Sequence, residues 1–155
     1  MRISAIVMCL VVWTATGDAR IHRSWSYDEL SAAAELIVIA TPIATRDRSE
    51  RETLPGITSV APNGKTSPVI AQRVETELRV VTVLKGKAGA TIVLHHDRDE
   101  PGDIAKNGPG FVAFAPKDKR QYLMFLTKGE GGQYVAVSGQ TDPDLAIEPL
   151  QHLAP

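Results

Sequence analysis

Residues 74–85, with the sequence VETELRVVTVLK, form the stretch that decides the fold. The first half alternates between residues expected to face a core and residues expected to face solvent, which is the pattern of a half-buried strand. The inward set is Val74, Thr76, Leu78 and Val80, and the outward set is Glu75, Glu77 and Arg79. After Val80 the alternation shifts by one residue, because Val81 and Val83 become the apolar set, and such a shift requires a bulge or a strong bend. A long strand bent in its middle is typical of a small closed barrel.

Further strand patterns surround this bent strand, which spans residues 69–85 as a whole. Apolar or alternating segments predict the other strands at residues 35–45, 91–96, 122–127 and 133–138. Pro42 cannot donate a backbone hydrogen bond, so the first of these strands must reach a sheet edge or bulge there. The glycine-rich residues 129–132 predict a tight turn between the last two strands.

Helical and loop signals complete the outline. Ser26 and Glu29 have the spacing of a capping box, which predicts a short helix over residues 26–34. A single helical turn is expected over residues 142–147. Two polar, turn-rich segments, residues 46–68 and 97–109, are predicted as surface loops.

Together these elements predict a mostly β protein with few helices. The strand spacing favours a small OB-like barrel of five to six strands with a short N-terminal helix. A β-sandwich is the alternative architecture. The length of 155 residues suits a single domain.

The N-terminal residues resemble a secretion signal. Arg2 supplies a positive charge, residues 3–15 form a short apolar segment, and Gly17 and Ala19 are the small residues of a cleavage site before Arg20. We therefore expect residues 1–19 to be a signal peptide, residues 20–155 to be the exported domain, and the location to be periplasmic or extracellular. An uncleaved anchor is the alternative. Cys9 is the only cysteine and lies within the signal, so thiol catalysis and disulfides are excluded for the exported domain.

Composition excludes other classes of protein. The net charge of −1 gives no electrostatic basis for binding nucleic acid or an anionic membrane. Hydrophobic residues make up 43% of the chain, which is too many for a disordered protein. No apolar run reaches the 18 or so residues of a spanning helix, so we expect no stable membrane insertion after signal cleavage.

Three stretches carry a resemblance to a known family. They are SYDELSAAAELIVIATPIAT (26–45), VETELRVVTVLKGK (74–87) and QYLMFLTKGEGGQYVAVSGQTD (121–142). Over roughly residues 27–140 the chain resembles exported bacterial proteins of unknown function whose OB-fold is similar to that of the tissue inhibitors of metalloproteinases and netrin-like modules. The resemblance implies an OB-fold. Those inhibitors chelate zinc through an N-terminal cysteine, which the exported domain lacks, so their mechanism does not carry over.

The densest cluster of ligand-type residues is HHDRDE, residues 95–100. Its imidazoles and carboxylates, above all those of His95, His96 and Asp97, are groups that bind divalent metals. Adjacent residues of a strand point to opposite faces, however, so the two histidines reach one ion only if the chain turns back. The competing interpretation is a strand end that runs into a solvated loop.

These observations lead to two main hypotheses about function, and an envelope protein of structural role with no small-molecule ligand is a third possibility. The first is a non-enzymatic binding or protein-interaction module without a cofactor, whose partner is another envelope or secreted protein. Its contact surface would be the loops at 46–68 and 97–109, because loops on a rigid barrel commonly carry function. The alternative is a metal-binding protein or metal-dependent hydrolase centred on residues 95–100.

Overall fold

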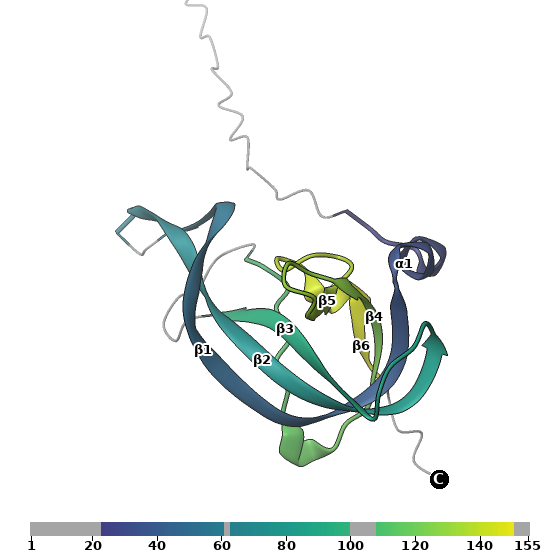
Figure 1. Cartoon of the computed structure of the whole chain (residues 1–155). Helices are drawn as coiled ribbons and strands as arrows, with labels where there is room; N and C mark the ends of the chain where they lie inside the picture. The colour runs from purple at the N-terminus through teal and green to yellow at the C-terminus, as the bar shows by residue number, and fades with distance from the viewer. Residues whose placement is uncertain (1–22, 61–62, 100–107, 151–155) are drawn as a thin grey trace, which may run out of the picture.

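The computed structural model describes residues 23–60, 63–99 and 108–150, so the predicted signal peptide lies outside the described residues. The protein is mostly β with one short α-helix (Figure 1). The elements are α1 (Tyr27–Ala33), β1 (Leu36–Val60), β2 (Thr66–Lys85), β3 (Thr91–Asp99), β4 (Tyr122–Lys128), β5 (Tyr134–Ala136) and β6 (Ile147–Pro149), with two 3₁₀ turns, η1 (Pro116–Asp118) and η2 (Pro143–Ala146). Within the described residues no helix is long and apolar enough to span a bilayer.

The predicted helix is confirmed together with its capping box. The Ser26 hydroxyl accepts a hydrogen bond from the backbone N–H of Glu29, and the Glu29 carboxylate accepts one from the backbone N–H of Ser26 (2.9 Å). Leu30 is the buried residue of this helix and packs against the sheet core.

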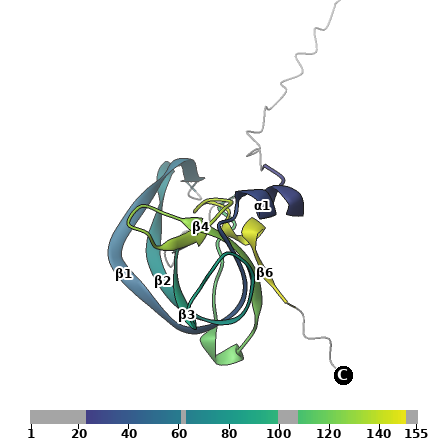
Figure 2. The same cartoon turned by 45° about the vertical axis from the view of Figure 1, so that its right-hand side comes forward.

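Five strands are hydrogen-bonded in a ring, in the order β1-β2-β3-β5-β4 and back to β1 (Figures 1 and 2). Neighbouring strands are antiparallel except β3 and β5, which are parallel and meet where Leu94 pairs with Tyr134. β6 pairs with β4 outside the ring. The sequence analysis did not predict β6; the helical turn that it did predict ends at Ala146, just before this strand.

The core draws residues from every strand of the ring. The largest completely buried apolar side chains include Leu36 and Val38 of β1, Leu78 of β2, Leu94 of β3 and Met124 of β4. Burial of these side chains is the main favourable contribution to the stability of a domain of this size. The predicted inward set of the bent strand is confirmed at Val74, Thr76 and Leu78, while Val80 is half-buried.

The predicted surface loop at 46–68 is wrong. β1 continues to Val60 and pairs with β2 from Thr66 onward, so this region is a long antiparallel ribbon that extends beyond the ring (Figure 1). We call residues 48–60 of β1 and 66–73 of β2 the β1–β2 arm. Its polar composition hid the strand, because much of the ribbon is exposed and needs no continuous apolar stripe. A second small core stabilises the arm; it contains Leu54, Val69 and Ala71, with Ile57 and Phe111 packed against it.

The predicted loop at 97–109 also needs correction in its first residues. β3 runs to Asp99, because residues 97–99 pair with residues 71–73 of the arm. Residues 100–107 lie outside the described part of the chain.

The predicted bulges are confirmed. The register between β1 and β2 shifts at Pro42. β1 pairs with β4 only up to Ala40, so no β4 residue lies opposite Pro42, which has no N–H to donate. In β2 the register skips Val81 and Leu84, where the alternation slips. The expected burial of Val81 and Val83 is wrong, however, since these residues are 49% and 38% exposed. The reason is that β2 continues beyond Arg79, where its pairing with β3 ends.

Candidate functional site

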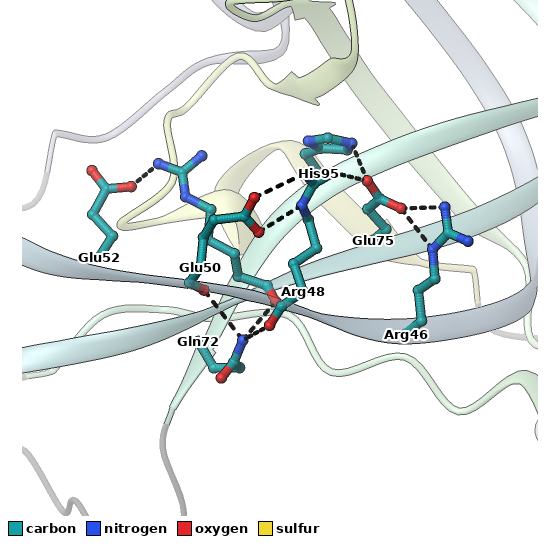
Figure 3. A network of polar contacts seen from close by, with 8 residues as sticks. Arg46, Arg48, Glu50, Glu52, Gln72, Glu75 and His95 are labelled. Carbon is teal, nitrogen blue, oxygen red and sulfur yellow. Dashed lines mark hydrogen bonds and ion pairs between the residues drawn. The ribbon is translucent and has the colours of Figure 1, made fainter.

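The candidate site is built around Glu75, whose predicted exposure to solvent is wrong. The residue is only 7% exposed. Cross-strand pairing places it between Arg46 of β1 and His95 of β3, so three neighbouring strands contribute one polar side chain each to the same row. Figure 3 shows the carboxylate between these two side chains, with Arg48 as the third partner.

All three partners contact the carboxylate oxygens of Glu75. Arg46 donates from Nε to Oε2 at 2.7 Å, and its Nη2 lies 2.5 Å from the same oxygen. Arg48 donates from Nη1 to Oε1, and Nε2 of His95 lies 3.0 Å from that oxygen. Hydrogen bonds from the arginines, that from Arg46 above all, lower the pKa of Glu75 below its usual range, against the opposing effect of burial. The carboxylate is therefore ionised at neutral pH.

His95 has the opposite balance of effects. Desolvation lowers the pKa of its imidazole, although the Glu75 carboxylate partly offsets this by favouring the charged form. We infer that the ring is mostly neutral at pH 7, since the ordinary histidine pKa of about 6.5 is already below that pH.

A side chain of β2 forms hydrogen bonds with a bulge in β1. The register between β1 and β2 is interrupted between Asp47 and Arg51, so residues 48–50 have no ladder partner on β2. Gln72 Nε2 donates to the carbonyl oxygens of Arg48 (2.5 Å) and Glu50 (3.3 Å) at this point. The amide satisfies backbone acceptors that the bulge leaves unpaired, and it thereby fixes the position of Arg48.

Exposed Glu50 and half-buried Glu52 pair with arginines at the surface of the arm. Glu50 accepts hydrogen bonds from Nε (2.9 Å) and Nη2 (3.1 Å) of Arg48, which lowers the pKa of Glu50 to about 2. Glu52 accepts a hydrogen bond from Arg73 across the ribbon. Arg48 therefore contacts two carboxylates, that of Glu75 at the sheet and that of Glu50 at the surface (Figure 3).

Charged and polar residues of β1, β2 and β3 line one side of a groove of about 570 Å³. The opposite side comes from the turn between β4 and β5. The lining residues are Arg48, Glu50, Arg51, Glu52, Arg73 and His95 from the three strands, with Glu130 and Gln133 from the turn. Glu75 itself borders a second, smaller hollow of about 120 Å³ beside Ala44 and Val93. The arm groove, as we call the larger one, combines guanidinium donors and carboxylate acceptors on a rigid sheet.

The structure separates the members of the predicted 95–100 cluster. His95 contacts Glu75, whereas His96 is buried in the core, where its Nε2 shares a hydrogen bond with Thr76 Oγ1 (2.9 Å) and its ring packs edge-on against Phe114. Burial lowers the pKa of His96 to about 4. The described residues, which exclude Glu100, contain no group of three or more His, Cys, Asp or Glu side chains placed to hold a metal ion.

Asp97 is a buried acid, with the residue 1% exposed. Its Oδ2 has no hydrogen-bond partner among the described residues, and desolvation raises the pKa of its carboxyl group. A raised pKa reduces the cost of burying this group, because the neutral form needs less solvation than the carboxylate.

Most of the contacts around Glu75 and of the adjoining arm groove could not be predicted from the sequence. Glu75 was noticed as an outward carboxylate, but its partners Arg46 and Arg48 were assigned to the edge of a loop. The clue lay in the mixed charge of residues 46–52, which suits cross-strand ion pairs with an adjacent charged strand. The sequence of this chain matches no protein-family model, and a comparison with curated proteins found no match.

Proposed function

We propose that this protein is a non-enzymatic binding module, exported from the cell, that holds a polar segment of another envelope or secreted protein in the arm groove. The observation that carries the proposal is the groove itself. Four separate segments contribute charged or amide side chains to one concave surface of about 570 Å³. Polar groups placed on a pre-formed concave surface fix the orientation of a ligand and provide specificity.

We further propose that the ring is an OB-like barrel. The supporting observation is the cyclic order β1-β2-β3-β5-β4, in which only the β3–β5 contact is parallel. OB-folds bind ligands on the face of strands 2 and 3, between the loops that join strands 1 to 2 and 4 to 5. The arm groove has this location, since β2, β3, the β1–β2 arm and the β4–β5 turn all line it.

The pKa values of the groove support binding over catalysis. A general acid or base works best when its pKa is close to the working pH. Here the pKa of Glu50 in the groove is about 2, and the pKa of Glu75, which borders the smaller hollow, is lowered by its arginine partners. The carboxylates are thus held as ion-pair partners, and they present fixed charges to a ligand.

Affinity capture with a blocked groove tests this function. Full-length protein is immobilised and exposed to envelope and secreted proteins, and captured proteins are identified by mass spectrometry and titrated individually. Gln133→Trp with Glu130→Lys fills the groove and changes its charge at the β4–β5 turn. Gln121→Trp with Asp118→Lys makes the same changes at the turn before β4, outside the groove, and serves as the matched control.

We expect a saturable partner that binds the wild type and the control and is lost from the blocked variant. If the blocked variant captures and titrates the same proteins with unchanged affinity, the groove is not the binding surface and the proposal fails. Circular dichroism of all three proteins verifies that each is folded.

A further inference from the structure

The end of β2 opposite the arm presents an open strand edge. β3 pairs with β2 only as far as Arg79, and the last backbone bond between these segments runs from Val80 N to Ala90 O (2.9 Å). Residues 82–85 continue to pair with β1 on the other side. In the described part of the chain no strand pairs with residues 81–85 along the edge that faces away from β1.

This edge is apolar and exposed, unlike the strand edges that proteins usually leave open. Val81, Val83 and Leu84 are 49%, 38% and 57% exposed, and Thr82 between them is exposed as well. An unpaired row of backbone groups with apolar side chains is the surface to which an extended peptide adds as a further strand.

The segment is held rigidly at its end. Gly86 has a φ of +82°, and a Cβ atom there would lie 2.4 Å from the carbonyl oxygen of Glu35, so only glycine permits this close turn. Lys85 Nζ donates to the carbonyl oxygen of Ser31 in α1 (2.6 Å). A strand that is already extended loses little conformational entropy when a partner pairs with it.

Basic residues lie at both ends of the open edge. Arg79 precedes it, Lys85 is its last residue and Lys87 follows it; all three are exposed, and none forms an ion pair within the described residues. A second copy paired antiparallel along residues 81–85 would bring the Lys85 and Lys87 end of each copy close to the Arg79 end of the other. Like charges at opposing positions are destabilising, so the charge pattern favours a partner strand with acidic ends over a second copy.

The two bulges limit the length of the partner. Bulges at Val81 and Leu84 increase the local twist of β2, which prevents a flat, open-ended stack of strands. The edge therefore suits one short strand.

We propose that residues 81–85 of β2 form a second interaction surface, which takes up by strand addition an extended apolar segment of a partner protein flanked by acidic residues. This surface lies at the opposite end of β2 from the arm and is independent of the arm groove.

The test uses the full chain and a blocked synthetic peptide, Glu-Glu-Thr-Val-Thr-Val-Thr-Glu-Glu, with a second peptide carrying lysines in place of the glutamates. Binding is measured by titration, and hydrogen exchange reports the backbone amides of residues 81–85. We expect saturable binding of the acidic peptide, slower exchange at these amides, and at least about tenfold weaker binding of the lysine peptide.

Variants locate the binding and test its charge dependence. Val83→Lys and Leu84→Lys should each weaken binding about tenfold, because a lysine on an edge opposes strand addition. Val60→Lys, at an equally exposed valine near the tip of the arm, is the matched control and should leave affinity unchanged.

Arg79→Glu with Lys87→Glu should reverse the preference toward the lysine peptide, whereas Lys65→Glu with Lys117→Glu should not.

Four results would overturn the proposal. They are no saturable binding up to about 1 mM peptide, equal affinity for both peptides, binding that leaves exchange at residues 81–85 unchanged, and self-association of the peptide-free chain that Val83→Lys abolishes. The last result would assign the edge to a second copy.

Discussion

β1 and β2 run through both the ring and the β1–β2 arm, yet different forces stabilise the two regions. In the ring, β1 and β2 contribute completely buried side chains such as Val38 and Leu78 to a core that every strand shares. In the arm, the same strands are joined by backbone pairing, the Glu52–Arg73 ion pair and a core of three buried residues. Exposed ion pairs contribute little to stability, so we expect the arm to open at a lower free energy than the ring. The candidate binding surface thus lies at the less stable end of the β1–β2 ribbon.

The largest effect is expected from a cavity in the ring. Leu78→Ala removes a side chain that is 0% exposed, and we expect a loss of about 2–5 kcal/mol in the free energy of unfolding. Urea unfolding of the full chain measures it. A loss below about 1 kcal/mol would show that the ring core can collapse around the cavity, and the contrast with the arm would disappear.

The next largest effect is a loss of stability at acid pH, which we expect from the buried His96 in the ring. The pKa of folded His96 is about 4, against about 6.5 when unfolded. Between these two pKa values the His96 ring binds a proton in the unfolded chain but not in the folded chain. The contribution of His96 to the free energy of unfolding is therefore fully present above pH 6.5 and is lost as the pH falls toward 4. We expect a contribution of about 3 kcal/mol across this window.

His96→Gln isolates this contribution, because it removes the titrating group and keeps a side chain that can bond Thr76. Unfolding curves of both proteins at pH 7 and pH 4.5 give the difference. Asp97, whose pKa is raised, acts in the opposite direction in both proteins: its burial costs stability as the pH rises above the ordinary aspartate pKa. Equal acid sensitivity of the two proteins would exclude His96 as the cause.

A smaller effect is expected from the core of the arm. Leu54→Ala removes the largest buried side chain of that cluster, and we expect a loss of about 2 kcal/mol, at the lower end for a buried leucine, because the small cluster can relax around the change. Hydrogen exchange should become faster in residues 48–60 and 66–73 while the amides of β4 keep their protection. Faster exchange in β4 as well would mean that the arm and the ring unfold as one unit.

The smallest effect concerns the electrostatics between the two regions. Glu75→Gln removes the carboxylate that favours protonation of His95, so the pKa of His95 should fall further. Titration of the His95 ring protons by nuclear magnetic resonance measures this change. His96, whose contacts do not include Glu75, is the internal control, and a shift of both histidines would indicate a general structural change.

Much of the ring could be predicted from local sequence. The Ser26–Glu29 capping box, the glycine turn at 129–132 and the inward residues Val74, Thr76 and Leu78 come from patterns between residues at most a few positions apart, and each was predicted correctly. The bulges also left a local sign, because the alternation slips at Val81 and Pro42 cannot donate. The opposite directions of His95 and His96 followed from the geometry of a strand alone.

The sequence by itself therefore determined the helix, most strands and their buried faces, since local patterns report which side of an element is apolar. Only the tertiary structure decided that residues 46–60 pair with β2, that Glu75 is buried, and that the β4–β5 turn faces the arm. The physical reason is that a charged side chain is buried only where distant partners stabilise its charge. The partners of Glu75 are 20 to 29 residues away along the chain, and no local pattern records them.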